Sequence, residues 1–156
     1  MKKMVTQLTN KLNKRRQVRE KAVQILFQLV DAPDYLTEEV ATEFALEAGN
    51  DPEAGFDEVE DQYLFELIKG VQENRDEIDQ MIEKYLSDWT IDRLNRIDLV
   101  VLRVALYELM YVSRETVPAK VAVNEAIDLS KLFSDEKSRR FVSGVLSEYL
   151  KQIETE

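Results

Sequence analysis

The sequence predicts an all-α protein of six or seven helices in two small packed bundles. The chain of 156 residues has only four glycines and three prolines, too few to join the strands of a sheet by tight turns. Its apolar residues instead recur three and four positions apart, which places them on one face of a helix. A chain of this length buries a self-sufficient core, so we expect a single helical domain over residues 1–156.

The N-terminal region is expected to begin as an arm and to continue as a helix. Residues 1–14 are polar and basic without helical periodicity, which favours a mobile basic arm. Apolar residues recur at helical spacing over 18–30, and Pro33 ends this helix. Arg15 and Arg19 fall near the apolar stripe, where burial of a guanidinium would be costly. We therefore expect the start of the helix to protrude beyond its packing partners.

Two further helices complete the first bundle, which we expect over about residues 15–88. A weaker helix covers 36–49. A stronger one begins at Asp57 and Glu60, which resemble a capping box with an aspartate, and it continues to about Ser87. The apolar pattern breaks after that residue, so the junction between the two bundles is expected there.

The second bundle is expected over about residues 91–153, around a central helix at 97–112. Only Asp98, Arg103 and Glu108 interrupt the apolar residues of this helix. A run of this length exceeds a normal strand and its charges do not alternate, so we expect a helix that is buried on most sides. Arg103 is expected to form an ion pair with Asp98 or Glu108.

Two helices follow the central one. Pro118 suits the first position of the next helix, because proline has no backbone N–H to leave unpaired there. Ser134 is expected to cap the last helix, where Asp135 and Glu136 favour the positive end of the helix dipole. Gly144 lies inside the apolar stripe of the last helix, and we expect it to mark a close crossing with a neighbouring helix.

The net charge of −10 conceals a basic N-terminus on an acidic chain. Residues 1–21 carry eight lysines or arginines and a single acid, whereas residues 31–62 carry twelve acids and no base. Because salt screens charges beyond about 8 Å, a polyanion that meets the N-terminus feels mainly the local charge. An acidic protein of this kind can bind RNA through one basic patch. The acidic stretch itself is typical of a solvated face that keeps a protein soluble.

The residue types that are missing exclude most catalytic chemistry. The chain has no cysteine and no histidine, which removes disulfides, thiolate and imidazole catalysis, and almost every kind of zinc site. It also has no glycine-rich phosphate loop. We therefore expect no enzyme, no cofactor and no metal site. With no apolar run near the ~20 residues of a membrane span and no signal-like leader, we expect a soluble, cytoplasmic protein.

Two clusters of basic residues stand near the starts of predicted helices. A positive side chain there opposes the helix dipole by ~0.3–1 kcal/mol, so a phosphate partner explains the clusters better than local stability does. Arginine forks onto phosphate or stacks on bases, and an aromatic ring supports an unpaired base. A solvated arm and a core position for the ring are the structural alternatives. The candidate residues for single-stranded RNA are Lys14, Arg15, Arg16, Arg19, Lys137, Arg139, Arg140 and Phe141.

Three parts of the sequence become informative when they are taken together. They are Arg15-Arg16-x-x-Arg19-Glu20-x-Ala22-Val23-Gln24, Ile97-Asp98-x-x-x-Leu102-Arg103-x-Ala105-x-Tyr107-Glu108-Leu109, and Val117-Pro118-x-Lys120-Val121-Ala122-Val123-Asn124-Glu125-Ala126 through Phe141-Val142-x-Gly144-Val145-Leu146. In this order and spacing the chain resembles the NusB family of bacterial transcription antitermination factors. The resemblance spans nearly the whole chain and is weak mainly over about 33–62.

The resemblance implies a fold, an RNA ligand and protein partners. It implies an all-helical fold of two bundles, an arginine-rich motif that binds the boxA element of ribosomal RNA leaders, and a heterodimer with the small-subunit ribosomal protein NusE. That pair would join NusA, NusG and RNA polymerase to help elongation pass terminators. Matched position by position, the family's RNA-binding residues are Lys14, Arg15, Arg16 and Arg19 in the arginine-rich motif, and Arg139, Arg140 and Phe141 at the start of the last helix.

Single positions refine this picture. Phe27 lies on the first helix where relatives often have an aromatic residue, and it is the candidate for the NusE surface. Gln17 interrupts the basic run of the arginine-rich motif. Ser143 stands where the family usually has an asparagine before glycine, which puts a polar contact there in doubt.

Two other classes of function remain open from the sequence. Some ribosomal RNA cytosine methyltransferases begin with a NusB-like domain, but they need a separate cofactor-binding domain with glycine-rich turns, for which no residues remain. The other class is a helical protein-binding adaptor without RNA specificity, in which the basic segment is incidental. Binding of boxA RNA separates both classes from the main prediction.

Overall fold

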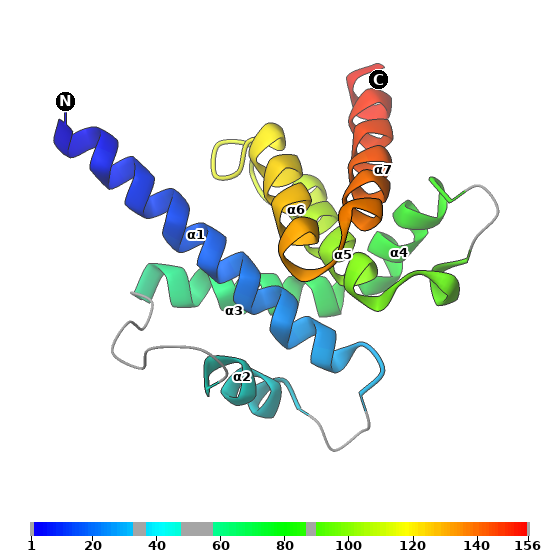
Figure 1. Cartoon of the computed structure of the whole chain (residues 1–156), viewed down its shortest axis with the longest axis horizontal. Helices are drawn as coiled ribbons and strands as arrows, with labels where there is room; N and C mark the ends of the chain where they lie inside the picture. The colour runs from blue at the N-terminus through cyan, green and yellow to red at the C-terminus, as the bar shows by residue number, and fades with distance from the viewer. Residues whose placement is uncertain (1, 33–36, 48–57, 87–89, 156) are drawn as a thin grey trace. The chain divides into compact units, whose positions relative to one another are not determined.

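The computed structural model describes residues 2–32, 37–47, 58–86 and 90–155, and within these ranges it has seven α-helices, a short 3₁₀ helix and no strand. The predicted all-α fold is therefore confirmed (Figure 1). In chain order the elements are α1 (Lys2–Leu29), α2 (Glu38–Glu47), α3 (Glu58–Glu73), α4 (Arg75–Glu83), η2 (Ile91–Arg93), α5 (Arg96–Tyr111), α6 (Ala119–Phe133) and α7 (Glu136–Thr155). None of the described helices is long and apolar enough to cross a membrane.

The chain divides into two compact units, residues 1–68 and 69–156, and the boundary falls inside α3. We expected two bundles at about 15–88 and 91–153, with a later junction. The difference has a physical reason, because α4 packs against α5 and so belongs to the second unit.

The first helix is longer than the sequence pattern predicts. Residues 1–14 were expected to be a mobile arm, but α1 begins at Lys2. The segment contains no glycine or proline, and it has four lysines, two leucines and two methionines, which have high helix propensity. A helix can therefore continue on propensity past the point where its apolar stripe ends.

The core of the first unit lies between α1, α2 and the start of α3. The side chain of Gln28 on α1 donates from Nε2 to the carbonyl oxygen of Ala41 on α2 at 3.2 Å, which ties the two helices together. The proposed helix start at Asp57 and much of the acidic stretch over 31–62 lie outside the described residues. The buried apolar side chains of this unit are Val18, Ala22, Val23, Ile25, Leu26, Ala41, Tyr63, Leu64, Leu67 and Ile68.

The expected single helix up to Ser87 is interrupted at Asn74, where α3 ends and α4 begins. Asn74 has φ −107° and ψ 16°, outside the helical range, and its Nδ2 donates to the carbonyl oxygen of Gly70 at 2.8 Å. Asparagine favours such local side-chain bonds over helix continuation. The apolar period alone did not reveal this break.

The central helix of the second unit is α5, as predicted. Every side chain from Asp98 to Leu109 is buried, and the helix packs against α4, α6 and α7 (Figure 1). Its first turn is capped by Asn95, whose Oδ1 accepts from the backbone N–H of Ile97 at 2.9 Å. A helix that is covered on most sides needs apolar residues all round, which is what the sequence supplies here.

The buried arginine of this helix has a different partner from the two that we expected. Arg103 donates from Nε and from a terminal nitrogen to the two carboxylate oxygens of Asp79 on α4, both at 2.8 Å. Asp98 and Glu108 stand five positions away on the same helix, whereas side chains meet at spacings of three or four. The prediction of a pair within α5 is therefore wrong.

The close helix crossing also lies at another glycine. Nothing lies within 4 Å of a Cβ added at Gly144, so the prediction of a close crossing there is wrong. A Cβ at Gly70 would clash with the ring of Tyr107 on α5. Gly70 is thus the position where the absence of a side chain lets the end of α3 approach α5.

The last two helices begin close to where we expected. Pro118 precedes the first residue of α6 as its N-cap. At α7 the cap is Asp135 and not Ser134, because Asp135 Oδ1 accepts from the backbone N–H of Ser138 at 2.8 Å. The hydroxyl of Ser134 donates instead to the hydroxyl oxygen of Ser138 at 2.8 Å. Ser138 is thereby fixed from two sides.

Candidate nucleic-acid interface

The first predicted cluster lies on α1 in the first unit. Lys14 and Arg16 are exposed, and Arg15 is partly exposed. The guanidinium carbon of Arg15 lies 3.8 Å from the centroid of the Tyr63 ring on α3. Tyr63 is itself buried, so its ring is a fixed support for this arginine. The charges of Lys14 and Arg16 therefore face solvent, whereas the guanidinium of Arg15 is held against the Tyr63 ring.

Arg19 departs from the expected protruding position, since it is only 2% exposed. It is not left without a partner. Lys21 is also buried, with only 7% of its surface exposed. Its Nζ donates to Gln24 Oε1 at 3.1 Å, and burial lowers the pKa of this lysine. At Arg19 and Lys21, α1 is therefore covered by other parts of the protein and does not protrude. Arg19 is therefore buried, and its guanidinium does not lie on the described surface.

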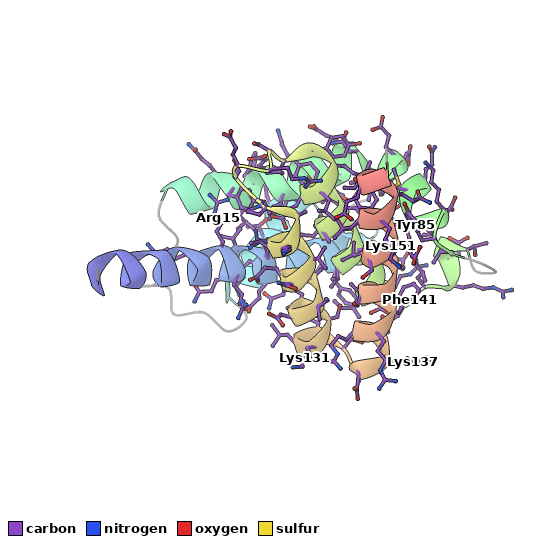
Figure 2. The ribbon with its side chains drawn as sticks, turned by 90° about the horizontal axis from the view of Figure 1, so that it is seen from above. Arg15, Tyr85, Lys131, Lys137, Phe141 and Lys151 are labelled. Atoms are coloured by element: carbon purple, nitrogen blue, oxygen red, sulfur yellow. The ribbon has the colours of Figure 1, made fainter. Side chains whose placement is uncertain are left out.

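The second predicted cluster borders a cleft in the second unit, which we call the Phe141 cleft. Its volume is about 560 Å³, and it opens between the segment after α4, η2 and the starts of α5 and α7. In Figure 2, Tyr85, Lys137 and Phe141 lie along one side of α7. The lining residues are Tyr85, Leu86, Arg93, Leu94, Asn95, Asp98, Asp135, Lys137, Ser138 and Phe141.

The floor of the Phe141 cleft carries a buried carboxylate. Asp98 is 7% exposed, and its Oδ2 accepts from the hydroxyl of Ser138 at 3.0 Å. Its Oδ1 is buried and has no hydrogen-bond partner among the described residues. Burial raises the pKa of Asp98, while the Ser138 hydroxyl acts in the opposite direction. Asp98 therefore keeps one buried oxygen without a donor from the described residues.

Two aromatic rings line the same cleft. Phe141 is partly exposed on α7. The Tyr85 hydroxyl donates to Gln152 Oε1 at 2.8 Å, and the Tyr85 ring meets the Tyr149 ring edge to face at 6.4 Å between centroids. Tyr85 is therefore held by α7 near the cleft. Fixed, partly exposed rings are suited to stack on a planar ligand.

The two arginines that precede Phe141 lie away from its cleft lining. Arg139 and Arg140 each pair with Oε1 of Glu136, at 3.0 and 3.3 Å, one turn earlier on α7. The Arg140 side chain is 76% exposed and that of Arg139 is 33% exposed. Arg139 also lines a second, smaller pocket with Lys131 at the turn between α6 and α7. Of these three predicted residues, only Phe141 lines the larger cleft.

The sequence analysis did not single out several residues of the Phe141 cleft. Tyr85 lies in the helix that we predicted up to about Ser87, and Asp98 was considered only as a charge in a buried helix. Arg93 and Ser138 carried no pattern. Their only sequence signal was the motif that contains Asp98, because the cleft is assembled from segments as far apart in the chain as Tyr85 and Phe141.

Phe27, the predicted partner-binding residue, is on the surface of the first unit. Its side chain is 48% exposed on α1, which is unusual for a large apolar residue. Phe65 on α3 is 59% exposed in the same unit. Exposed aromatic rings of this kind are typical of protein-binding surfaces.

The two basic clusters belong to different compact units, so each is described by itself. In the parts of the chain that the structure describes, no group of three or more His, Cys, Asp or Glu residues is placed to hold a metal ion. The features of the described residues that could bind a ligand are their charged side chains, their exposed aromatic rings and the unpartnered Oδ1 of Asp98.

Comparison with proteins of known sequence places these features in a family. The model of the NusB family matches residues 16–151. The chain is 43% identical over 141 residues to the transcription antitermination protein NusB of Bacillus subtilis (strain 168), covering 90% of this chain and 98% of that protein. It is 45% identical over 138 residues to NusB of Lactiplantibacillus plantarum, covering 88% and 94%.

Solved structures agree with the sequences. A crystal structure of the antitermination factors NusB and NusE in complex with dsRNA superposes with a TM-score of 0.75 at 25% identity, covering 90% of this chain and 98% of that chain. A structure of T. maritima NusB gives a TM-score of 0.75 at 32% identity, covering 88% and 90%. Since the family model spans most of the chain and the relatives are similar over almost their whole length, this chain belongs to the NusB family.

Proposed function

We propose that this protein is an RNA-binding transcription antitermination factor that binds the boxA element of ribosomal RNA leaders together with NusE. The complex then joins NusA, NusG and RNA polymerase during elongation. The protein acts by binding and not as an enzyme. Its place of action is the cytoplasm, where transcription and ribosomal RNA synthesis take place in bacteria.

The relatives support this proposal. The similar proteins from B. subtilis and L. plantarum are transcription antitermination proteins, and both are similar over nearly their full length. One similar solved structure contains NusB, NusE and dsRNA together. A NusE partner and an RNA ligand for this chain follow as the simplest assignment.

The observation that carries the proposal is the basic segment of α1. On a chain with a net charge of −10, Lys14 and Arg16 are exposed and Arg15 is supported on the Tyr63 ring. Such a local positive patch attracts phosphate despite the overall negative charge, because distant acidic groups are screened. Arg19 is assigned a supporting role in this segment because it is buried.

The start of α7 is assigned the second RNA contact. Phe141 offers a partly exposed ring for an unpaired base, and Arg139 and Arg140 supply charge nearby in sequence. Phe27 is assigned to the NusE surface because it is a large apolar side chain that remains 48% exposed.

The test is a titration of labelled boxA RNA and of a scrambled RNA with the purified chain, with and without NusE. We expect the chain and NusE together to bind boxA RNA more tightly than either protein alone, and more tightly than they bind the scrambled strand. Lys151→Ala is the control variant, since Lys151 is exposed on the C-terminal part of α7 and pairs only weakly with Glu148 at 3.4 Å. Equal affinity for both RNAs, with and without NusE, would contradict the proposal.

One alternative has a specific observation in its favour. The exposed rings of Phe27 and Phe65 fit a helical adaptor that binds proteins without RNA specificity. In that case NusE would bind the chain, and Phe27→Ala would weaken that binding, but boxA RNA would not be preferred over the scrambled strand.

A further inference from the structure

We infer that an RNA strand lies directly on the surface of α7 at Gly144, with a sugar of its backbone in the space that a side chain would fill. The inference rests on the proposed function, because it takes the RNA ligand and its contact at the start of α7 as given. It adds a further contact residue, whose contribution is the absence of a side chain. Larger residues at this position are expected to exclude the strand.

Gly144 has no explanation in the packing of the described residues. It lies in the interior of α7 and is exposed, and a Cβ added to it meets nothing within 4 Å apart from the backbone of its own helix. Gly70 is the opposite case, because a Cβ there would clash with the ring of Tyr107. A glycine inside a helix is destabilising relative to alanine, since it loses more backbone freedom on folding. Gly144 therefore weakens α7 without any gain in packing among these residues.

The close approach of another molecule explains a glycine at this position. Glycine is the residue expected where a ligand comes close to the backbone, because it has no Cβ. A helical side chain covers the turn that precedes it, so the lack of one at Gly144 leaves the helix surface beside Arg140 and Phe141 uncovered. These two residues stand four and three positions earlier, and they are therefore neighbours of Gly144 on the helix surface.

The two neighbours of Gly144 suit the two ends of a nucleotide. The Arg140 side chain is 76% exposed, and its pair with Glu136 at 3.3 Å is an exposed one that a phosphate can replace. Phe141 is partly exposed and is the residue assigned to the base. In a nucleotide the sugar joins the phosphate to the base. A strand that contacts both side chains therefore brings its sugar to the surface beside them, where Gly144 lies.

The surroundings of Gly144 favour RNA over a protein segment. The exposed residues of the next turn, Ser147 and Glu148, are polar, whereas the centre of a protein interface is depleted in charged residues. The large exposed apolar residue of α7 is Ile153, which stands two and a half turns later and so on the opposite side of the helix. Lys137 is exposed on the same side as Gly144, two turns earlier, and Figure 2 shows it near the start of α7. The strand is therefore expected to extend from Gly144 toward the start of the helix, because cations attract its phosphates.

The experiment measures the affinity of the full chain for labelled boxA RNA in the presence of NusE, by fluorescence anisotropy, for the wild type, Gly144→Ala and Gly144→Leu. Alanine and leucine both favour a helix, so each variant should raise the melting temperature by about 1–4 °C at this open position. The affinity for RNA should change in the opposite direction. We expect Gly144→Ala to weaken binding by about fivefold and Gly144→Leu by about fiftyfold, because the added volume lifts the strand off the helix.

Ser147→Ala is the matched control. Ser147 is exposed on the next turn of α7, and alanine raises the helix propensity there without adding volume. We expect this variant to have a higher melting temperature and an unchanged affinity for RNA. The binding of NusE to each variant is measured in parallel without RNA, and it should equal that of the wild type. A gain of stability together with a loss of RNA affinity excludes unfolding as the cause.

The outcomes separate this inference from the proposed function. If the wild-type chain binds boxA RNA and Gly144→Leu binds it as tightly, the inference fails and the proposed function stands. If the wild type does not bind boxA RNA in the presence of NusE, the proposed function itself fails. A lower melting temperature for Gly144→Ala would show that the glycine serves the fold, and weaker NusE binding by the Gly144 variants would show that a protein covers this surface. Either result overturns the inference, as does an equal loss of RNA affinity in Ser147→Ala.

Discussion

The guanidinium of Arg15 rests on the ring of Tyr63, with 3.8 Å between the guanidinium carbon and the ring centroid. One face of the planar group is covered by a buried side chain of another helix, while its hydrogen-bond donors lie in the plane of the group and point outward from its edges. An arginine that is held in this way loses less side-chain freedom when it binds a phosphate.

This contact predicts an energetic coupling between Arg15 and Tyr63 in RNA binding. Arg15→Ala should weaken boxA binding, and Tyr63→Leu should weaken it too, although Tyr63 itself is buried. A double-mutant cycle on RNA affinity should give a coupling energy of about 0.5–2 kcal/mol, the usual range of cation–π contacts. Tyr63→Phe keeps the ring and should retain most of the coupling. Strictly additive effects would show that the ring does not position the arginine.

The exposed and buried parts of the basic segment should respond differently to salt. Replacement of Arg15 and Arg16 by alanine should reduce the slope of log K against log salt by ~0.7 for each lost phosphate contact on a single strand. Arg19→Ala should leave the slope unchanged and lower the melting temperature, because Arg19 is 2% exposed. Salt titrations and thermal melts of the same variants test this. A reduced slope for Arg19→Ala with an unchanged melt would place its guanidinium on the RNA.

Phe141→Ala should weaken RNA binding through the loss of base stacking, by about 1–3 kcal/mol. Because Phe141 is only partly exposed, the same change also removes packing at the start of α7. Binding therefore has to be measured beside the free energy of unfolding. Phe141→Leu is the control, since leucine keeps apolar packing without an aromatic face. If both variants bind RNA equally well and only the melt falls, Phe141 is a core residue.

Asp98→Asn should stabilise the protein at neutral pH. Burial raises the pKa of Asp98 from its ordinary value of 3.8, so the folded state disfavours the ionised form. A group with a raised pKa contributes stability below its unfolded-state pKa and loses that contribution as the pH rises through its folded-state pKa. Asparagine avoids this loss and keeps an oxygen for the Ser138 hydroxyl.

Urea unfolding at neutral and at acidic pH measures the effect. The variant should be more stable than the wild type at neutral pH, and the two should converge when Asp98 is protonated. A variant that is less stable at neutral pH would mean that the carboxylate supports the fold.

The ion pair between Arg103 and Asp79 should contribute to stability far more than a surface pair. Their side chains are 10% and 21% exposed and make two bonds of 2.8 Å. Arg103→Ala should reduce the free energy of unfolding by about 1–3 kcal/mol, because Asp79 loses its charged partner. Lys151→Ala breaks an exposed pair with Glu148 and should change stability by less than about 1 kcal/mol. Equal effects of the two substitutions in urea unfolding would contradict this ranking.

The helices of the second unit were largely readable from the sequence because they depend on local patterns. The central helix was expected at 97–112 and occurs as α5 at 96–111, since its run of apolar residues is long and interrupted by few charges. The start of α6 after Pro118 follows from the properties of one residue. Local rules of this kind need no knowledge of the neighbouring elements.

Features that depend on contacts between distant segments were not readable. The partner of Arg103 is Asp79, which lies 24 positions earlier on another helix. The close crossing lies at Gly70 because the ring of Tyr107 packs against this glycine. The burial of Arg19 and the buried, unpartnered oxygen of Asp98 depend on how the helices pack. Phe141 was found through the family resemblance and its aromatic character, and the rest of its cleft required the structure.

The length of α1 bears on how an RNA strand is recruited. A helix that begins at Lys2 and ends at Leu29 extends about 42 Å at 1.5 Å per residue. A disordered tail with the same lysines would have to be immobilised on the nucleic acid, at an entropic cost of about 1–2 kcal/mol for each ordered residue. A rod has already incurred that loss during folding, so more of the electrostatic attraction remains as net affinity. Substitution of a proline within residues 5–12 would interrupt this helix and weaken binding of the strand without removing a single charge.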